Sequence, residues 1–161
     1  MGMPFNADEV FEMAEQIERN GARFYRAAAE KFPAVREALL DLAAIEDDHE
    51  KIFAAMRGQL STSEQVPPVF DPDGEAQMYL RAMADGHVFN VKADPVEQLA
   101  GKDTAEEVLK MAIGLEKDSI AFYVGLKESV SHKAGKDKVE AIIKEEFGHI
   151  ATLNEKLAAL E

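Results

Sequence analysis

Two Glu-x-x-His motifs are the residues of this sequence whose types and spacing are best suited to chemistry. Glu46 and His49 form the first motif, and Glu146 and His149 form the second, at an offset of 100 residues. Side chains three positions apart lie on one face of a helix. A carboxylate and an imidazole in this spacing can therefore bind the same metal ion, although one such motif alone is a weak signal.

Both motifs belong to an internal repeat. Residues 17–25 and residues 115–123 are similar at an offset of 98, and each segment has a Glu, Glu18 or Glu116, ahead of a Phe-Tyr pair. Each half of the chain thus has the same order, a Glu before an aromatic pair and then a Glu-x-x-His. A repeat of this kind predicts two similar structural units.

The apolar residues recur at alternating spacings of three and four, which predicts helices packed in a bundle. We expect four long helices, near residues 6–31, 34–60, 103–130 and 136–160. Asn6 or Asp8 can cap the first helix, and Asp103 or Thr104 the third, because their side-chain oxygens can accept hydrogen bonds from unpaired amides.

Two breaks divide the helices into pairs. Phe32-Pro33 interrupts the first pair, and residues 131–137, with Gly135, interrupt the second. The apolar stripe expected on the second helix consists of Val35, Ala38, Leu42, Ile45, His49, Ile52 and Met56.

The four Glu of the repeat fall on or beside the apolar stripes, so they should face the core. Glu18 and Glu46 are each 14 residues from position 32, and Glu116 and Glu146 are each 15 residues from position 131. Within each hairpin the two carboxylates therefore lie at one level. A two-fold arrangement of the hairpins would bring all four together near the middle of the bundle.

Buried carboxylates require compensation, because an unpaired buried charge costs several kcal/mol. Four carboxylates and two neutral imidazoles carry a charge of −4, which two divalent ions would balance. The oxygen-rich ligand set suits iron or manganese. The alternative is a buried polar network without a metal.

Length and composition restrict the other possibilities. A chain of 161 residues suits a single domain over 1–161, and the absence of Cys excludes thiol catalysis and Cys-ligated clusters. A net charge of −13 argues against nucleic acid as a partner. No apolar run is long enough to span a membrane, and the N-terminus lacks a signal-peptide pattern, so we expect a cytoplasmic protein.

Residues 61–102 differ from the rest and form a long crossover between the second and third helices. Turn signals dominate its first part, and a short helix is expected over about 75–85, ending near Gly86. The crossover is rich in apolar residues that should pack on something. We therefore expect a homodimer with residues 75–89 at the interface. The competing interpretation is a monomer whose short helix covers its own bundle and the metal entrance.

These motifs make the chain resemble the rubrerythrin-like branch of the ferritin-like di-iron carboxylate family, over about residues 6–60 and 103–160. The resemblance implies an all-α fold, a ferritin-like antiparallel four-helix bundle with a long crossover between helices 2 and 3. It also implies a metal-ligand set in which Glu46 and Glu146 bridge two iron ions, with manganese or zinc as alternatives. The implied ligands are Glu18, Glu46, His49, Glu116, Glu146 and His149.

The resemblance implies an oxidoreductase that reacts with oxygen or hydrogen peroxide. Two departures qualify this. The chain has no Cys, so it lacks a rubredoxin domain and needs an external electron donor, and Ile113 stands where rubrerythrins have a further Glu on helix three. The competing functions are Fe(II) oxidation for iron storage or delivery, and a binding or scaffold module with a structural metal pair.

Several other residues near the motifs carry two interpretations. Tyr25 and Tyr123 are core aromatics, or they donate hydrogen bonds to ligand carboxylates. His87 and His132 are expected to be exposed, with a gate or additional ligand as the alternative for His87. The acidic residues beside the motifs are expected on a solvated helix face, with support of the ligands as the alternative; they are Asp47, Asp48, Glu50 and Glu145.

Overall fold

Two helical hairpins account for most of the structure. The computed structural model describes residues 6–60, 73–84, 97, 99–130 and 133–160. The first hairpin consists of α1 (Ala7–Lys31), the short 3-10 helix η1 (Pro33–Val35) and α2 (Arg36–Gly58), and the second consists of α5 (Ala105–Ser129) and α6 (Lys133–Ala159). A shorter helix, α3 (Glu75–Ala84), precedes α5. The described residues form no strand, and the predicted all-α class is confirmed.

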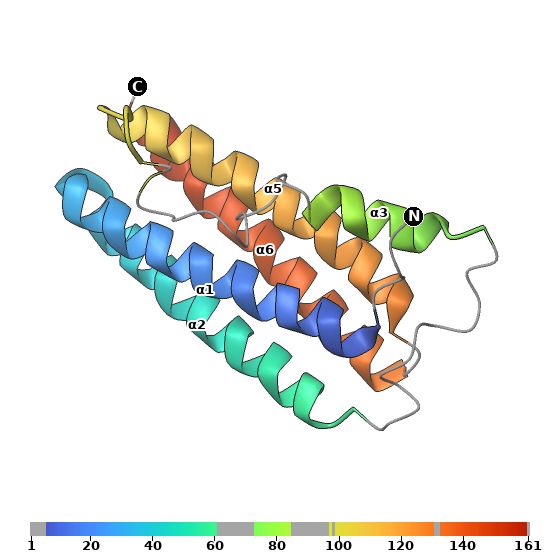
Figure 1. Cartoon of the computed structure of the whole chain (residues 1–161). Helices are drawn as coiled ribbons and strands as arrows, with labels where there is room; N and C mark the ends of the chain where they lie inside the picture. Colours follow the sequence, from blue (N-terminus) through green and yellow to red (C-terminus); the bar gives the residue numbers. More distant parts are fainter. Residues whose placement is uncertain (1–5, 61–72, 85–96, 98, 131–132, 161) are drawn as a thin grey trace.

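The hairpins pack side by side into a four-helix bundle (Figure 1). Helix α1 packs mainly on α2, and α5 packs mainly on α6, while α1 contacts α5 and α2 contacts α6 across the bundle. Helices α2 and α5 run in the same direction, which the long crossover between them makes possible (Figure 1). The ferritin-like topology expected from the sequence is therefore confirmed.

The helix ends are explained by local chemistry. The Asn6 side chain accepts a hydrogen bond from the backbone N–H of Glu9, and the Thr104 side chain accepts one from Glu107, so each caps its helix as one of the two expected candidates. The second break is shorter than the predicted range of residues 131–137, because α6 already begins at Lys133. Gly135 therefore lies inside α6, where a Cβ would come within 2.7 Å of the side chain of Val130.

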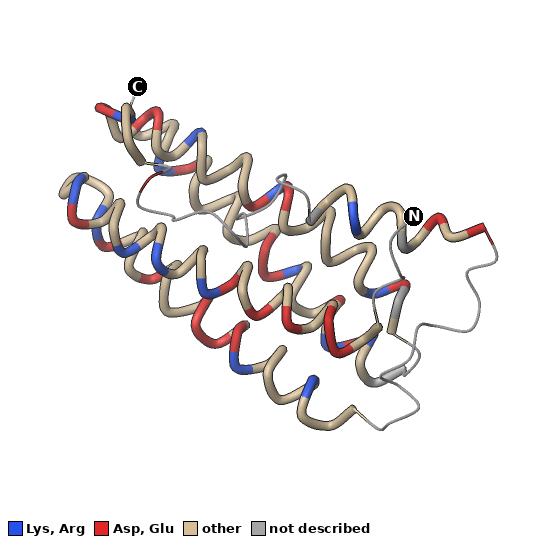
Figure 2. The backbone as a smooth tube through the Cα atoms, in the orientation of Figure 1, with Lys and Arg blue, Asp and Glu red and all other residues tan. Residues whose placement is uncertain are grey.

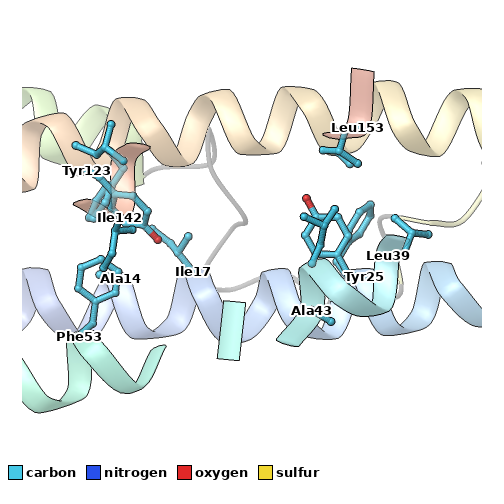
Figure 3. Close-up of a cluster of buried hydrophobic side chains, with 14 of the residues drawn as sticks. Ala14, Ile17, Tyr25, Leu39, Ala43, Phe53, Tyr123, Ile142 and Leu153 are labelled. Atoms are coloured by element: carbon cyan, nitrogen blue, oxygen red, sulfur yellow. The ribbon is translucent and has the colours of Figure 1, made fainter. Parts of the chain in front are cut away.

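The core lies between the hairpins and is divided along its length. In Figure 3 the labelled side chains form two apolar groups, one around Tyr123 and one around Tyr25, and both tyrosine hydroxyls point into the interval between them.

The apolar stripe expected on α2 is wrong at two positions: the exposed fraction is 36% for Ile45 and 37% for Ile52. Both face a groove between α2 and α6, where the two helices make few close contacts.

Helix α3 packs on the outer side of α5. Leu80 is fully buried there, and the Tyr79 hydroxyl donates a hydrogen bond to the carbonyl oxygen of Ala121. The contact depends on Gly125, since a Cβ at that position would lie 2.5 Å from the ring of Tyr79. The short helix thus covers its own bundle, in agreement with part of the competing interpretation, but its described residues do not line the groove beside α2. The expected end near Gly86 lies outside the described residues.

Charged positions are spread along all four long helices and form no continuous basic strip (Figure 2). Several acidic positions lie inside the bundle, and the next section describes them. Within the described ranges, none of the helices is long and apolar enough to cross a membrane.

Candidate metal centre

The six residues singled out in the sequence lie together in the middle of the bundle. Helices α1 and α5 each contribute one Glu, and α2 and α6 each contribute a Glu and a His from one helical face. All six side chains are buried, with at most 4% exposed: Glu18, Glu46, His49, Glu116, Glu146 and His149. The distances of the four Glu from the two turns predict that they meet near the middle of the bundle, and the structure places them there.

Their ligand atoms form two overlapping groups. In the first, one atom each from Glu18, His49, Glu46 and Glu146 lies within 4.8 Å of the others. The second contains Glu46 and Glu146 again, together with Glu116 and His149. Two carboxylates are thus common to both groups, and each group has one Glu and one His of its own.

The two imidazoles point their Nδ1 atoms at the carboxylates. The Nδ1 of His49 lies 2.9 Å from a Glu146 oxygen and 3.5 Å from Glu18, and the Nδ1 of His149 lies 3.2 Å from Glu46. The rings stack at a centroid distance of 5.7 Å, with an interplanar angle of 16°. Both histidines therefore enter the carboxylate layer from the α2–α6 side, in nearly parallel orientation.

Many of these atoms lack a hydrogen-bond partner despite their burial. Among the described residues, eight buried side-chain nitrogen and oxygen atoms make no hydrogen bond, and all eight belong to the six residues of this cluster. Buried polar groups in proteins are nearly always hydrogen-bonded. Atoms that approach one another without hydrogen-bond geometry instead suit a shared cation. The donor set of carboxylates and imidazoles fits divalent iron, manganese or zinc.

Two tyrosines hold the carboxylates from outside the cluster. The hydroxyl of Tyr123, on α5, donates a hydrogen bond of 2.5 Å to Glu18 on α1. The hydroxyl of Tyr25, on α1, donates one to Glu116 on α5. Each hairpin therefore orients the Glu of the other. Both interpretations of the tyrosines hold, because the rings lie in the buried core and the hydroxyls support the cluster carboxylates.

Burial and neighbouring charges shift the pKa values of the cluster residues in different directions. Burial, with repulsion from neighbouring carboxylates, raises the pKa of Glu46 well above its ordinary value and that of Glu116 to about 8. Burial alone would lower the pKa of the histidines, but adjacent carboxylates outweigh it and raise the pKa of His49 to about 11 and that of His149 to about 10. Contacts with the histidines and with Glu116 outweigh burial at Glu146, whose pKa is lowered.

A groove connects the cluster to the surface. It lies between α2 and α6 and has a volume of about 880 Å³. Its walls include both His49 and His149, the apolar side chains of Leu42, Ile45 and Ile52, and several acidic residues. A small molecule or ion could therefore approach the histidine side of the cluster without passing between α1 and α5.

The acidic residues flanking the motifs differ in their roles. Asp47 pairs with Arg26, and Glu50 pairs with Arg19, on the outside of the first hairpin as expected for a solvated face. Asp48 is exposed and lies 3.6 Å from Lys51.

Glu145 departs from that expectation. Its side chain is 58% exposed, yet one of its oxygens lies 2.5 Å from the Nε2 of buried His49. Sequence spacing gives no signal for this contact, because Glu145 and His49 lie on different hairpins. His87 and His132, the other two histidines considered, lie outside the described residues.

Comparison with known families agrees with this arrangement. The family model for rubrerythrin matches residues 9–157. The chain belongs to the rubrerythrin family. No curated protein matches the sequence.

A solved structure is also similar. The crystal structure of a Thermotoga maritima protein described as ferritin-like and diiron-carboxylate matches with a TM-score of 0.77 and 27% sequence identity, over 100% of both chains. The rubrerythrin-family fold and the Glu/His cluster together indicate a metal pair.

Proposed function

We propose that this rubrerythrin-family chain is a diiron oxidoreductase that binds two iron ions in the bundle core and reacts with oxygen or hydrogen peroxide. The observation that carries the proposal is that six buried residues on four helices bring together nitrogen and oxygen atoms, most of which make no hydrogen bond. Leaving so many buried polar atoms unpaired is costly unless a bound cation compensates them.

The two groups of ligand atoms suggest how the ions are held. Glu18 and His49 would hold the ion at the first position, and Glu116 and His149 the ion at the second. Glu46 and Glu146, which belong to both groups, would bridge the two positions. Bound iron supplies a one-electron change at each ion, so that the pair can supply the two electrons that reduce a peroxide.

The chain's own residues would limit access to the bound ions and orient two of their ligands. Burial excludes bulk water, and the Tyr25 and Tyr123 hydroxyls fix the orientation of two ligand carboxylates, which lowers the entropic cost of binding. The groove between α2 and α6 gives small reactants a route to the histidine side.

The reductant and the preferred oxidant follow from what the sequence lacks. Because these 161 residues contain no Cys to ligate an electron-relaying iron, we expect an external electron donor. Ile113 provides a half-buried hydrocarbon, not a carboxylate, one turn before Glu116. We therefore expect reaction with oxygen to be at least as efficient as peroxidase turnover, and manganese or zinc to compete for the site.

Anaerobic loading tests the proposal. The protein should bind two Fe(II) per chain, and Glu46→Ala or Glu146→Ala should each impair both positions, whereas Glu140→Ala on the exposed face of α6 should impair neither. Stopped-flow absorbance with oxygen and with peroxide then reports the redox reaction. A stoichiometry of one, insensitive to both bridging variants, would refute the metal pair. Two redox-silent metals that raise the melting temperature would instead favour a structural role.

A further inference from the structure

The two halves of the cluster are nearly symmetric, and they differ most at the outer nitrogens of the histidines. The repeat relates Glu46 to Glu146 and His49 to His149 at an offset of 100. The Nε2 of His49 contacts a Glu145 oxygen at 2.5 Å. The Nε2 of His149 is buried and, among the described residues, makes no hydrogen bond.

The difference coincides with one of the positions at which the two halves of the repeat differ. The position that corresponds to Glu145 at the same offset is Ile45. Both residues line the groove between α2 and α6, as do both histidines. One wall of the groove thus presents a carboxylate to the opposite hairpin's histidine, while the other wall presents a branched hydrocarbon that cannot accept a hydrogen bond.

A carboxylate on the outer nitrogen changes what an imidazole does as a ligand. It fixes the tautomer in which Nδ1 carries the lone pair, fixes the ring orientation and makes the imidazole a stronger donor to a metal. Glu145 comes from α6 and His49 from α2, so the contact also connects the two hairpins across the groove.

We propose that Glu145 is a positioning residue that makes the two metal positions unequal: the ion held by Glu18 and His49 binds first and more tightly, and the ion held by Glu116 and His149 is the exchangeable one. The inference rests on the proposed metal pair and adds an order of loading to it. Because the groove reaches both histidines, the weaker position also remains open to small molecules from solvent.

Stepwise titration with Co(II) at pH 7, followed by absorbance, tests this order. The wild-type protein should bind two Co(II) in two resolved steps, and His49→Ala should abolish the tighter one. Glu145→Ala should weaken the tighter step by roughly 10–100-fold, the usual effect of removing such a partner, and leave the weaker step within about threefold. Glu145→Gln keeps an acceptor but loses the charge, so its effect should be intermediate.

Three comparisons separate positioning from other causes. Glu140→Gln removes the same charge from an exposed site on α6 and should leave both steps unchanged. Ile45→Glu supplies the missing carboxylate and should bring the two Co(II) binding constants closer together. In the Zn(II)-loaded protein, the Nε2 proton of His49 should be visible by NMR as slowly exchanging, and Glu145→Ala should remove that signal.

The titration distinguishes failure of this inference from failure of the proposed metal pair. Two equal binding steps in the wild-type protein would overturn the inequality, and two unequal steps that neither Glu145→Ala nor Ile45→Glu alters would overturn the role of Glu145. Either result would leave the metal pair intact. Binding of fewer than two Co(II) to the wild-type protein would overturn the proposed function and this inference with it.

Discussion

Loading the cluster with two divalent ions at pH 7 should release about three protons per chain. At this pH three of its groups carry a proton in the metal-free protein, because the pKa is about 11 for His49, about 10 for His149 and about 8 for Glu116. Metal ligation requires neutral imidazoles and ionised carboxylates, so binding must displace these protons.

The sign of the pH dependence follows from the direction of these shifts. Each group has a raised pKa, so its protonated form competes with metal, and the apparent affinity rises as the pH rises. With about three protons displaced, the overall constant for two ions should increase by roughly 10³ per pH unit near neutrality. Above pH 8 the slope should fall to about two, because Glu116 then loses its proton before the metal arrives.

The metal-free protein should show the opposite trend in stability. A raised folded-state pKa contributes stability that is present below the unfolded value and is lost as the pH rises through the folded value. For the histidines this window runs from 6.5 to about 10 or 11, and for Glu116 it runs from 4.5 to about 8. The melting temperature of the metal-free protein should therefore fall between pH 5 and pH 10, while added metal should restore it increasingly well.

Isothermal titration calorimetry measures the released protons directly. Anaerobic Fe(II) titrations at pH 7 in buffers of different ionisation enthalpy give the proton number as the slope of observed heat against that enthalpy. Glu116→Gln should release about one proton fewer, because it removes one titrating carboxyl. Release of one proton or none by the wild-type protein would show that the cluster is already deprotonated and would refute the reasoning.

Three further changes test separate contacts. Tyr123→Phe removes the only donor seen on Oε1 of Glu18 among the described residues, and should lower the free energy of unfolding of the metal-free protein by about 1.5–3 kcal/mol in urea titrations. Glu116→Gln should raise the melting temperature of the metal-free protein at pH 9, where the carboxyl is ionised, and change it little at pH 6. Met78→Glu alters a half-exposed residue of α3 and should dissociate the expected homodimer, as followed by light scattering; Tyr79 is a poorer choice, because its ring already packs on α5.

The ligand positions could be predicted from the sequence because they depend on short-range regularities. Helical spacing places Glu46 and His49 on one face, and equal distances from a turn place Glu18 and Glu46 at one level. Both relations hold within a hairpin, where helix geometry alone fixes them. The repeat then supplies the second hairpin without further information.

Contacts between hairpins could not be predicted in the same way. Whether Ile45 and Ile52 face the core or the groove depends on how far α2 stands from α6, which the stripe on α2 does not determine. The contact of Glu145 with His49 depends on the same separation. A sequence pattern reports the face on which a side chain lies, but the rotation of one hairpin against the other decides what that face meets.

The tyrosines show how the two halves complete one another. Tyr25 and Glu18 lie on α1, seven residues apart, but each of them bonds to α5: Tyr25 to Glu116, and Glu18 to Tyr123. Each of these two tyrosine hydrogen bonds therefore crosses between the hairpins. Docking of the hairpins brings these tyrosines to the cluster, and separating the hairpins removes both donors. An ion pair bound by all four helices would stabilise that same docked state, which links metal binding to the association of the two halves.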